Sequence, residues 1–389
     1  MIGLLLAFAT VYLSVLFLLI YMENAEEMED PEPSRFPSID IIVPAYNEEK
    51  HIAETIESLL KLEYAGKKRI IVVNDGSKDG TLKVAKRFEK KGVLVLDKPN
   101  GGKASAINVG LKHARAELVA VLDADSIVAK DALGHMVGYF DDARVAAVTP
   151  MMKVWRARTP VQALQKAEYV LNSFAKKILE QLDAITVTPG PFSIYRRKVF
   201  STLGGFDENT VTEDQEIALR LQKANCKIAS SYGAVVYTDA PEGLRELYTQ
   251  RKRWYRGFLE NAWNYRGLIN PSYGDLGLVI IPASLIMIAL GVFALLYSAF
   301  NAITSPFSFK LGLAPFFLGP TEFVMAIAAL VSFAMVLLAA RKLHENNPIS
   351  LFISTAIMSP LMAVFWLAIL IGAVKDSLLG VHISWKAEG

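Results

Sequence analysis

The sequence predicts an α/β domain on a doubly wound, mostly parallel sheet, joined to apolar helices long enough to cross a membrane. Two observations predict it. Apolar strand-like runs alternate with helical segments through the polar middle of the chain, an order typical of parallel sheets with helices on both faces. Charge-free segments of about the 17–25 residues that a membrane helix needs flank this block. They are Met1–Met22, Leu276–Phe300, Phe323–Ala340 and Ile349–Val374.

Composition narrows the class of protein. The chain has 389 residues, 52% of them hydrophobic, and a net charge of only +2, so nothing indicates a nucleic-acid partner. The single cysteine, Cys226, excludes a disulfide framework and fits a reducing cytosol. Met1–Met22 has no basic start and no small-residue cleavage site before Glu23, so we expect an uncleaved anchor rather than a signal peptide.

Strands and helices are expected in a regular order through the polar block. The expected strands are Ile39–Pro44, Arg69–Asn74, Gly92–Asp97, Glu117–Asp123 and Arg144–Pro150. We expect Asn47 to cap the first helix. Of the three helices that follow, one is expected to end at Lys91, one to end at Arg115, and one to lie near Ala129–Phe140. Ligands bind at the carboxyl ends of strands in such sheets, and polar motifs follow several of these strands, which indicates a site there.

The chain divides into five expected parts. They are a transmembrane helix (1–22), a solvated acidic linker (23–38), the α/β domain (39–240), interfacial helices (241–275) and a transmembrane region of about three spans (276–389). Basic and apolar residues share the helices expected at Pro160–Ala184 and Gly243–Ile269. This pattern favours helices that lie in the membrane interface over helices that only pack on the sheet.

Carboxylates follow two of the expected strands. Asp123-Ala124-Asp125 suits a hard divalent ion that binds phosphate oxygens, although strand-end turns are also rich in aspartate. Asp75 could accept a hydrogen bond from a base or ribose, or form an Asx turn. Gly101-Gly102-Lys103 resembles a phosphate cradle but lacks the P-loop spacing, and no Rossmann glycine pattern follows the first strand.

Two later motifs are also open to two interpretations. Glu213-Asp214 starts an expected helix, where acids occur for catalysis or simply because of the helix dipole. Gln250, Arg253 and Trp254 fall within one helical turn and can face one way. Arginine there could clamp a diphosphate and tryptophan could stack on a sugar, or both could be interfacial anchors.

The order of the motifs is more specific than any one of them. In sequence they are Pro44-Ala45-Tyr46-Asn47-Glu48, Asn74-Asp75-Gly76-Ser77, Gly101-Gly102-Lys103, Asp123-Ala124-Asp125, Thr212-Glu213-Asp214 and Gln250-Arg251-Lys252-Arg253-Trp254. From Ile39 to Tyr265 the chain thus resembles the processive branch of family 2 glycosyltransferases, which includes cellulose, chitin, hyaluronan and poly-N-acetylglucosamine synthases. The resemblance implies a GT-A fold and inverting transfer of a hexose from a nucleotide sugar, with UDP expected, to a membrane-associated saccharide.

The resemblance also implies roles for individual residues. Pro44, Tyr46, Glu48, Asp75, Lys103 and Asp123 would bind the nucleotide, Asp125 would hold Mg²⁺ or Mn²⁺, Asp214 with Glu213 would be catalytic, and Gln250, Arg253 and Trp254 would shape the diphosphate and acceptor pocket. Asp214 would be the general base that inverting displacement needs. The chain departs from the family at Thr188–Phe192, where cellulose synthases carry a cysteine, and Ser384-Trp385-Lys386 only loosely resembles the gating loop.

Location follows from the donor implied by the resemblance. Nucleotide sugars are cytosolic, so we expect a multi-pass plasma-membrane protein with a cytoplasmic catalytic domain and with Arg341-Lys342 inside, as the positive-inside rule asks. Counting four spans places the C-terminus outside, which conflicts with Trp385 as a gate unless one segment is re-entrant. The alternative enzyme is a single-transfer synthase that acts on a glycolipid or a polyprenyl phosphate. A transporter is disfavoured because the spans contain no ionisable residue.

Overall fold

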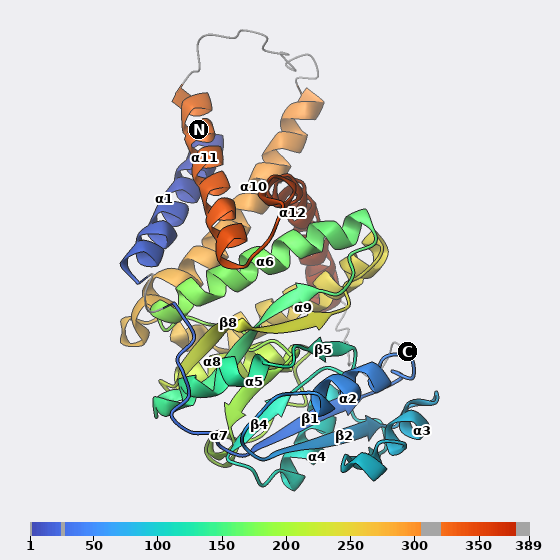
Figure 1. Ribbon diagram of the computed structural model, residues 1–389. Coiled ribbons are helices and arrows are strands. Elements are labelled where there is room, and N and C mark those ends of the chain that lie inside the picture. Colours follow the sequence, from blue (N-terminus) through green and yellow to red (C-terminus); the bar gives the residue numbers. More distant parts are fainter. Residues whose placement is uncertain (1, 25–27, 305–319, 379–389) are drawn as a thin grey trace.

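A mixed eight-stranded sheet forms the centre of the computed structural model, which describes residues 2–24, 28–304 and 320–378 (Figure 1). In space the strands follow the order β3-β2-β1-β4-β7-β6-β8-β5. Their bounds are β1 (Ile39–Ala45), β2 (Lys68–Asp75), β3 (Leu94–Lys98), β4 (Leu118–Val121), β5 (Ser126–Val128), β6 (Val145–Val154), β7 (Ser193–Arg196) and β8 (Lys227–Thr238).

The two halves of the sheet differ in strand direction. β3, β2, β1 and β4 are parallel neighbours, as the sequence predicts. In the other half β7 runs antiparallel to β4 and β6, β5 runs antiparallel to β8, and only β6 and β8 are parallel. The α/β class is therefore confirmed, whereas the parallel character belongs to one half. The sequence prediction missed β5 and β7 because they are short, and β8 because Ser230, Ser231 and Gly233 interrupt its apolar pattern.

Helices cover both faces of the sheet. β1 buries Ile41 and Val43 in the cluster that includes α2, and Ile42 on the other face beneath α4, where it touches Gly110. These layers fix the carboxyl ends of β1, β2 and β4 at one edge of the domain. The covering helices are α2 (Ile52–Leu60), α3 (Thr81–Lys86), α4 (Lys103–His113), α5 (Ala132–Val137), α7 (Arg197–Leu203) and α8 (Glu213–Lys223), with 3₁₀ turns at Glu89–Lys91 and Gly138–Asp141.

Asn47 does not cap the first helix, so that expectation is wrong. α2 begins only at Ile52, and Asn47 adopts a left-handed backbone with φ of 56°. Its Oδ1 accepts a hydrogen bond from the N–H of Lys78 (2.9 Å), and its own N–H donates to Oγ of Ser77 (3.1 Å). Asparagine tolerates this backbone conformation well, and here it fastens the loop after β1 to the loop after β2.

Two long helices lie between the sheet and the apolar helices, α6 (Pro160–Gln181) and α9 (Leu244–Asn264) (Figure 1). The expected basic face of α6 is partly wrong, because Lys177 is fully buried. Its Nζ donates to Oε2 of Glu180 (2.8 Å) and to the hydroxyl of Tyr139 (2.7 Å). Sequence periodicity cannot distinguish a lysine that is paired inside the domain from one that faces lipid headgroups.

The charge of the acidic linker predicts that it is solvated, but the structure shows that one of its residues, Asp30, is not. Asp30 accepts hydrogen bonds from the Tyr139 hydroxyl (2.7 Å), the Ser231 hydroxyl (2.9 Å) and the N–H of Gly233 (2.7 Å). The irregular middle of β8, one of the strands that the sequence prediction missed, supplies the last two donors. Asp30 thus fastens the chain that follows the first apolar helix to the central sheet.

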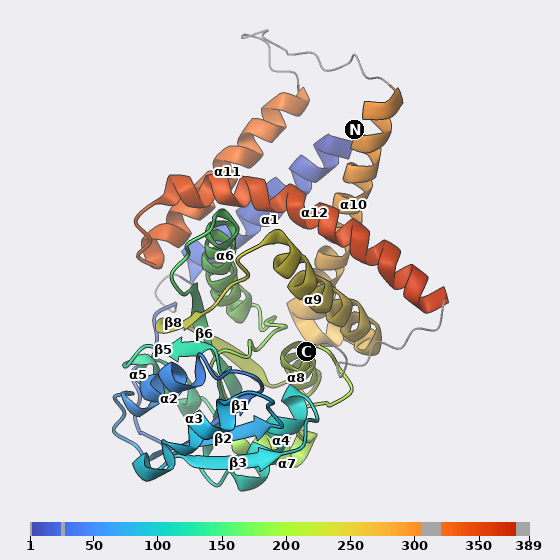
Figure 2. The ribbon, with the colours of Figure 1, turned by 90° about the vertical axis from the view of Figure 1, so that its right-hand side faces the viewer.

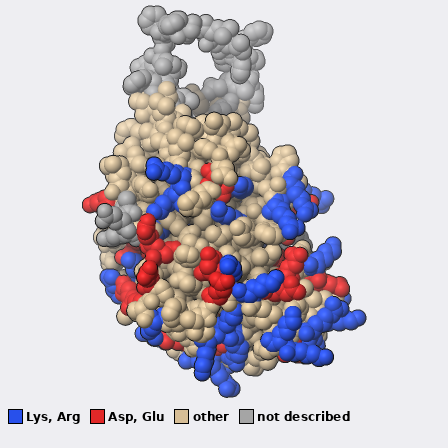
Figure 3. Space-filling model, in the orientation of Figure 1, with Lys and Arg blue, Asp and Glu red and all other residues tan. Residues whose placement is uncertain are grey.

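Apolar helices form at each of the four segments where the sequence predicts them. They are α1 (Ile2–Glu23), α10 (Ile281–Thr304), α11 (Pro320–Lys342) and α12 (Pro348–Leu378), and a π-helical turn at Leu276–Ile280 precedes α10. Within the described residues, Leu276–Tyr297 and Pro348–Ala373 are long and apolar enough to cross a membrane. Figure 3 shows charged side chains gathered over the sheet-bearing part and few around the upper helices. The other two spans stay predictions, and the gating-loop candidate lies outside the described residues.

Candidate active site

Lys103 joins three of the predicted motifs at one edge of the sheet. It is the first residue of α4, and its Nζ lies 2.5 Å from Oδ1 of Asp123 and 3.1 Å from Oε1 of Glu213. Asp123 follows β4 and Glu213 begins α8. Burial opposes a charged amine, but the two carboxylates raise the pKa of Lys103 above its ordinary value. The structure therefore brings nucleotide-binding and catalytic candidates into one ion-paired group, which we name the Lys103 cluster.

The Thr-Pro-Gly-Pro-Phe segment before β7 lies against this cluster. A Cβ atom on Gly190 would lie 2.5 Å from Nζ of Lys103 and 2.6 Å from Oδ2 of Asp123, so only glycine leaves room for the ion pair. The hydroxyl of Thr188 donates to the backbone oxygen of Asp214 (2.9 Å). Sequence reasoning noted this segment only as a departure from cellulose synthases. The sequence feature that could have pointed to this segment is a proline–glycine turn directly before a short strand.

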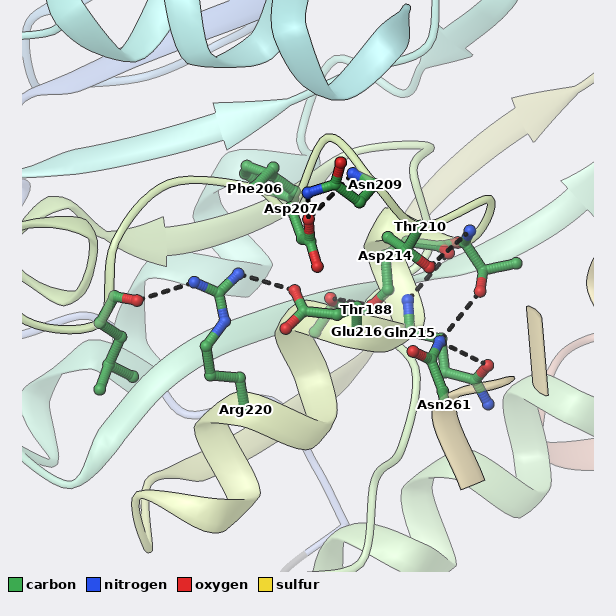
Figure 4. Close-up of polar contacts among 12 residues, drawn as sticks. Thr188, Phe206, Asp207, Asn209, Thr210, Asp214, Gln215, Glu216, Arg220 and Asn261 are labelled. Atoms are coloured by element: carbon green, nitrogen blue, oxygen red, sulfur yellow. Dashed lines mark hydrogen bonds and ion pairs between the residues drawn. The ribbon is translucent and has the colours of Figure 1, made fainter. Parts of the chain in front are cut away.

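Asp214 lies half-buried in the first turn of α8. Figure 4 shows it with Thr188 and Gln215 at the start of this helix, with Asn261 of α9 facing them. Its Oδ1 accepts a hydrogen bond from the N–H of Gln215 (2.9 Å). Burial and the adjacent carboxylate of Glu213 raise the pKa of Asp214 to about 6. A carboxylate with this pKa is ionised at neutral pH and is a stronger base than an exposed aspartate.

The pKa of Glu213 is shifted in the opposite direction from that of Asp214. Although burial favours its neutral form, the ammonium of Lys103 lowers the pKa of Glu213. Two neighbouring acids on α8 are therefore pushed apart in pKa, and such separation often assigns different roles to paired carboxylates. α9 supports this turn, because Nδ2 of Asn261 donates to Oγ1 of Thr212 (3.0 Å) and Gly257 lies directly against that threonine.

Asp125 is the candidate metal ligand. Burial, and then the carboxylates of Asp123 and Glu48, raise the pKa of Asp125 to about 7. A partly buried carboxylate among like charges is stabilised by a cation, and hard divalent ions prefer such oxygens. No metal-binding group of three or more His, Cys, Asp and Glu occurs among the residues that the structure describes. The carboxylate of Asp125 fits a hard divalent ion that also binds phosphate oxygens and water.

The predicted nucleotide residues of the first motif lie at the carboxyl end of β1. Pro44 is buried within the strand, and Tyr46 and Glu48 follow it half-buried. Nδ1 of His51 lies 2.9 Å from Oε2 of Glu48, and its Nε2 lies 3.8 Å from Oδ2 of Asp239. Burial lowers the pKa of His51, but Glu48 and Asp239 outweigh it and raise the pKa. Sequence reasoning missed His51 and Asp239, which come from separate segments.

Asp75 holds a loop in place. Its Oδ1 accepts from Nζ of Lys98 (2.5 Å) and from the N–H of Gly101 (3.0 Å), and its Oδ2 accepts from the N–H of Gly102 (2.8 Å). The interpretation of this loop as a phosphate cradle is therefore wrong for these two amides, because they point at an aspartate. The loop instead places Lys103, the next residue, at the cluster.

The predicted acceptor turn of α9 has one buried arginine, Arg251, which the sequence analysis did not single out. Arg253 is exposed, and its Nη1 lies 3.4 Å from a backbone oxygen of the loop before α8. Arg251 is buried, donates to Oε2 of Glu168 (2.7 Å) and lies 4.1 Å from the ring centre of Trp254. Oε1 of Gln250 is buried and has no hydrogen-bond partner among the described residues.

Known proteins share this domain and its fold. Residues 40–204 match the family model described as glycosyl transferase family 2. The poly-beta-1,6-N-acetyl-D-glucosamine synthase of Staphylococcus epidermidis is 30% identical over 241 residues, which cover 60% of this chain and 58% of that protein. The enzyme of the same name from Staphylococcus aureus strain COL is 30% identical over 238 residues, covering 60% and 56%. The matches thus span less than three fifths of these relatives.

A solved structure aligns over nearly the full length of this chain. A mannosyltransferase from Pyrobaculum calidifontis in complex with GDP-Man and Mn²⁺ superposes with a TM-score of 0.60 at 20% identity, covering 99% of this chain and 100% of the other. At this identity the likeness concerns the fold. The family match covers β1 to α7, and the motif order and the Lys103 cluster extend the same pattern to α8. Residues 40–204 of this chain are therefore similar to glycosyl transferase family 2.

Proposed function

We propose that the chain is an inverting glycosyltransferase that moves a sugar from a UDP-sugar to a saccharide acceptor held at the membrane. The observation that carries the proposal is the Lys103 cluster. One ammonium group contacts Asp123 and Glu213, which come from the end of a strand and the start of a distant helix. The next residue after Glu213 is Asp214, whose raised pKa suits a general base.

The donor nucleotide would lie across the carboxyl ends of β1, β2 and β4, where open α/β sheets bind ligands. Tyr46 and Glu48 follow β1, Asp75 ends β2 and Asp123 follows β4. Among the described residues, Oδ2 of Asp75 accepts one hydrogen bond, from the N–H of Gly102, so a second lone pair is left for an N–H group of a uracil base. Lys103 would then lie beside the diphosphate.

Mg²⁺ or Mn²⁺ would bind at Asp125, where it would neutralise charge on the leaving diphosphate. Asp123 is already neutralised by Lys103, whereas the raised pKa of Asp125 indicates a carboxylate that a cation would stabilise further. The two aspartates of the motif would thus differ in role. Asp123 would position Lys103 and the nucleotide, and Asp125 would hold the ion.

Asp214 would accept the proton of the acceptor hydroxyl. As this proton leaves, the hydroxyl oxygen bonds to the anomeric carbon, and the bond from that carbon to the diphosphate oxygen breaks with its electron pair remaining on UDP. A single displacement from the opposite face inverts the anomeric centre. Glu213 stays ionised beside Lys103 and raises the pKa of Asp214, so it tunes the base without taking the proton.

The acceptor would reach Asp214 along α9. The buried oxygen of Gln250, which has no partner among the described residues, suits a sugar hydroxyl. Arg251 covers one face of Trp254, and the other face would stack on the sugar. Arg253 is exposed and long enough to reach a diphosphate. The apolar helices would anchor the chain in the plasma membrane as a multi-pass protein, with the catalytic domain in the cytoplasm where nucleotide sugars occur.

The base assignment is tested with Asp214→Asn, which keeps the shape of the side chain but cannot take the proton. We expect turnover to fall at least about 10²-fold while the Kd for UDP stays nearly unchanged. Asp131→Asn, at the exposed start of α5, is the matched control and should be fully active. Normal turnover of Asp214→Asn would show that another group is the base.

Product size separates the two acceptor classes. With a panel of nucleotide sugars assayed by nucleotide release, mass spectrometry of the product should show a saccharide of several units if the chain extends a polymer, as the names of the staphylococcal relatives specify for those proteins. A single sugar on a lipid would instead support the single-transfer alternative, and the same base would then serve a lipid hydroxyl or phosphate.

A further inference from the structure

A cavity of about 410 Å³ lies between α8 and α9, and none of the site residues predicted above lines it. The two helices lie one above the other in Figure 2, and the loop before α8 forms a third side of the cavity. Glu216, Arg220 and Lys223 of α8 line it, and at 100° per residue they fall within about 60° of one another around the helix. Asp214 lies about 160° from Glu216, so the cavity and the candidate base are on different faces of α8.

Every residue that lines this α8–α9 cavity has a side chain that can form hydrogen bonds. By contrast, the cavity between α4 and α7 includes the apolar side chains of Leu111, Phe200 and Phe206. Ligand sites have volumes of about 300–1,000 Å³ and are usually lined mostly by apolar and aromatic side chains. The α8–α9 cavity is large enough for a ligand, and its composition fits a ligand that is polar on all sides rather than a lipid chain.

The charges in the α8–α9 cavity are nearly balanced. Three carboxylates line it, those of Asp207, Glu216 and Glu260, together with the cationic side chains of Arg220 and Lys223. A phosphate group or a nucleotide would therefore meet more negative than positive charge. A neutral polyhydroxyl compound suits this mixture, because each hydroxyl donates one hydrogen bond and accepts up to two. The lining thus favours a neutral saccharide.

Internal hydrogen bonds hold the walls of the cavity in place. Glu216 is buried and accepts from Nη2 of Arg220 (2.7 Å) and from the hydroxyl of Tyr265, which joins α8 to the end of α9. Nδ2 of Asn261 joins α9 to the start of α8 through Oγ1 of Thr212 (3.0 Å). Groups that are already fixed lose little conformational freedom when a ligand binds, so this arrangement favours binding.

Other groups of the cavity are open to a ligand. Asp207 accepts from the N–H of Asn209 through Oδ1 (2.9 Å), which leaves Oδ2 without a partner among the described residues, and Figure 4 shows this side chain directed from the loop toward α8. Nε of Arg220 is buried and has no hydrogen-bond partner in the part of the chain that the structure describes. Lys223 and Asn264 are exposed, and within the same described ranges their side chains form no hydrogen bond or ion pair.

We propose that the α8–α9 cavity binds a neutral oligosaccharide, as a saccharide site separate from the place of transfer. The carboxylates of Asp207 and Glu260 accept hydrogen bonds from sugar hydroxyls. Arg220, Lys223 and Asn264 donate hydrogen bonds to them. The inference rests on the proposed function in one respect, since the saccharide that the cavity retains is the acceptor or the product of this enzyme. A saccharide bound at two places dissociates more slowly than one bound only at the acceptor turn.

Saccharide binding in the absence of any donor tests the inference. The full-length protein with Trp254→Ala, which weakens the predicted acceptor turn, is titrated in detergent with chitotetraose by calorimetry. We expect binding, and we expect Asp207→Asn and Asn264→Trp, each added to this background, to raise the Kd at least about tenfold. The first replaces the open acceptor oxygen by a donor, and the second fills the cavity from its exposed side. Absence of binding in the Trp254→Ala protein, or an unchanged Kd in both cavity variants, would overturn the inference.

Three controls accompany the titration. Asp131→Asn changes an exposed aspartate at the start of α5 and should leave the Kd unchanged. Thermal midpoints close to that of the Trp254→Ala protein show that the cavity variants fold. Inorganic phosphate should not compete with chitotetraose, and competition would contradict a site for a neutral ligand.

The two proposals fail in different ways. Binding is measured without a donor, so a chain that binds chitotetraose in the α8–α9 cavity but transfers no sugar would count against the proposed function alone. A chain that transfers sugar, but whose cavity variants bind chitotetraose as tightly as the Trp254→Ala protein, would count against this inference alone.

Discussion

A methyl group added at Gly190 is the smallest change that displaces the Lys103 cluster. The added carbon would lie 2.5 Å from Nζ of Lys103 and 2.6 Å from Oδ2 of Asp123, whereas ordinary contact starts at 3.4 Å. The two charged groups must therefore retreat by about 0.9 Å, and misplacement on the order of 1 Å can cost about 10²-fold in rate. We expect Gly190→Ala to lose about that factor in kcat/KM for sugar transfer.

Stability should respond much less, because the atoms that must move are the ends of side chains. Gly190 does not have the left-handed backbone that would make alanine strained. We expect the thermal midpoint to fall by no more than roughly 2–4 °C, which corresponds to about 1 kcal/mol. Nucleotide release and product formation give the rate, and thermal unfolding in detergent gives the midpoint.

Gly134→Ala is the matched control, since a Cβ at this position of α5 meets nothing within 4 Å. It should keep full activity and gain slightly in stability, because alanine is favoured over glycine inside a helix. Full activity of Gly190→Ala would refute the reasoning, as it would show that the Lys103 cluster tolerates displacement. A loss of activity that merely followed unfolding would also refute it.

The remaining predictions concern the pH profile, the metal, the acceptor turn and the loop. Because Asp214 must be ionised and its pKa is about 6, turnover should rise with pH through about 6 and be roughly tenfold below its plateau at pH 5; a flat profile would exclude it as the base. Excess EDTA should abolish transfer, Mg²⁺ or Mn²⁺ should restore it, and Asp125→Ala should weaken nucleotide binding; activity in chelator would remove the metal role. Trp254→Ala should lower transfer more than donor hydrolysis, whereas Arg253→Lys should lower both, since lysine cannot contact a diphosphate with two prongs; equal small effects would make this turn a helix anchor. Asp75→Asn should lower the free energy of unfolding by about 1–3 kcal/mol, because an amide cannot accept from all three donors that the carboxylate holds; unchanged stability would show that the loop is held otherwise.

The predictable part of the site consists of residues that follow strands. Asp75 and Asp123 occur at the ends of apolar runs, and in a parallel sheet such positions meet at one edge. The sequence therefore indicates that they are neighbours without any knowledge of distances. Their contacts were not predictable. Asp75 accepts from N–H groups of the loop after β3, and Asp123 pairs with Lys103. The path of each loop decides which donor lies close enough to bind, and the sequence does not show that path.

Residues from unpredicted strands and loops account for most of what sequence reasoning missed. Gly190 precedes β7, and Asp239 follows β8, and neither strand shows the alternation with helices that marks the parallel half. Arg251 was missed for a different reason. Four basic residues lie close together on α9, and only packing decides that Arg251 is the one buried against Glu168 while Arg253 stays exposed.

By itself, the sequence determined the α/β class, the ends of the strands that bear the site, and the four apolar helices, because each depends on local periodicity and on charge-free length. Only the tertiary structure decided which groups touch within the site. The raised pKa of Asp214 is an example, since it needs burial and the charge of Glu213 at short range, which together outweigh the opposing charge of Lys103. The direction of α12 is another example. Its hydrophobic composition predicts that the helix is removed from water, but only its packing on α9 determines its orientation.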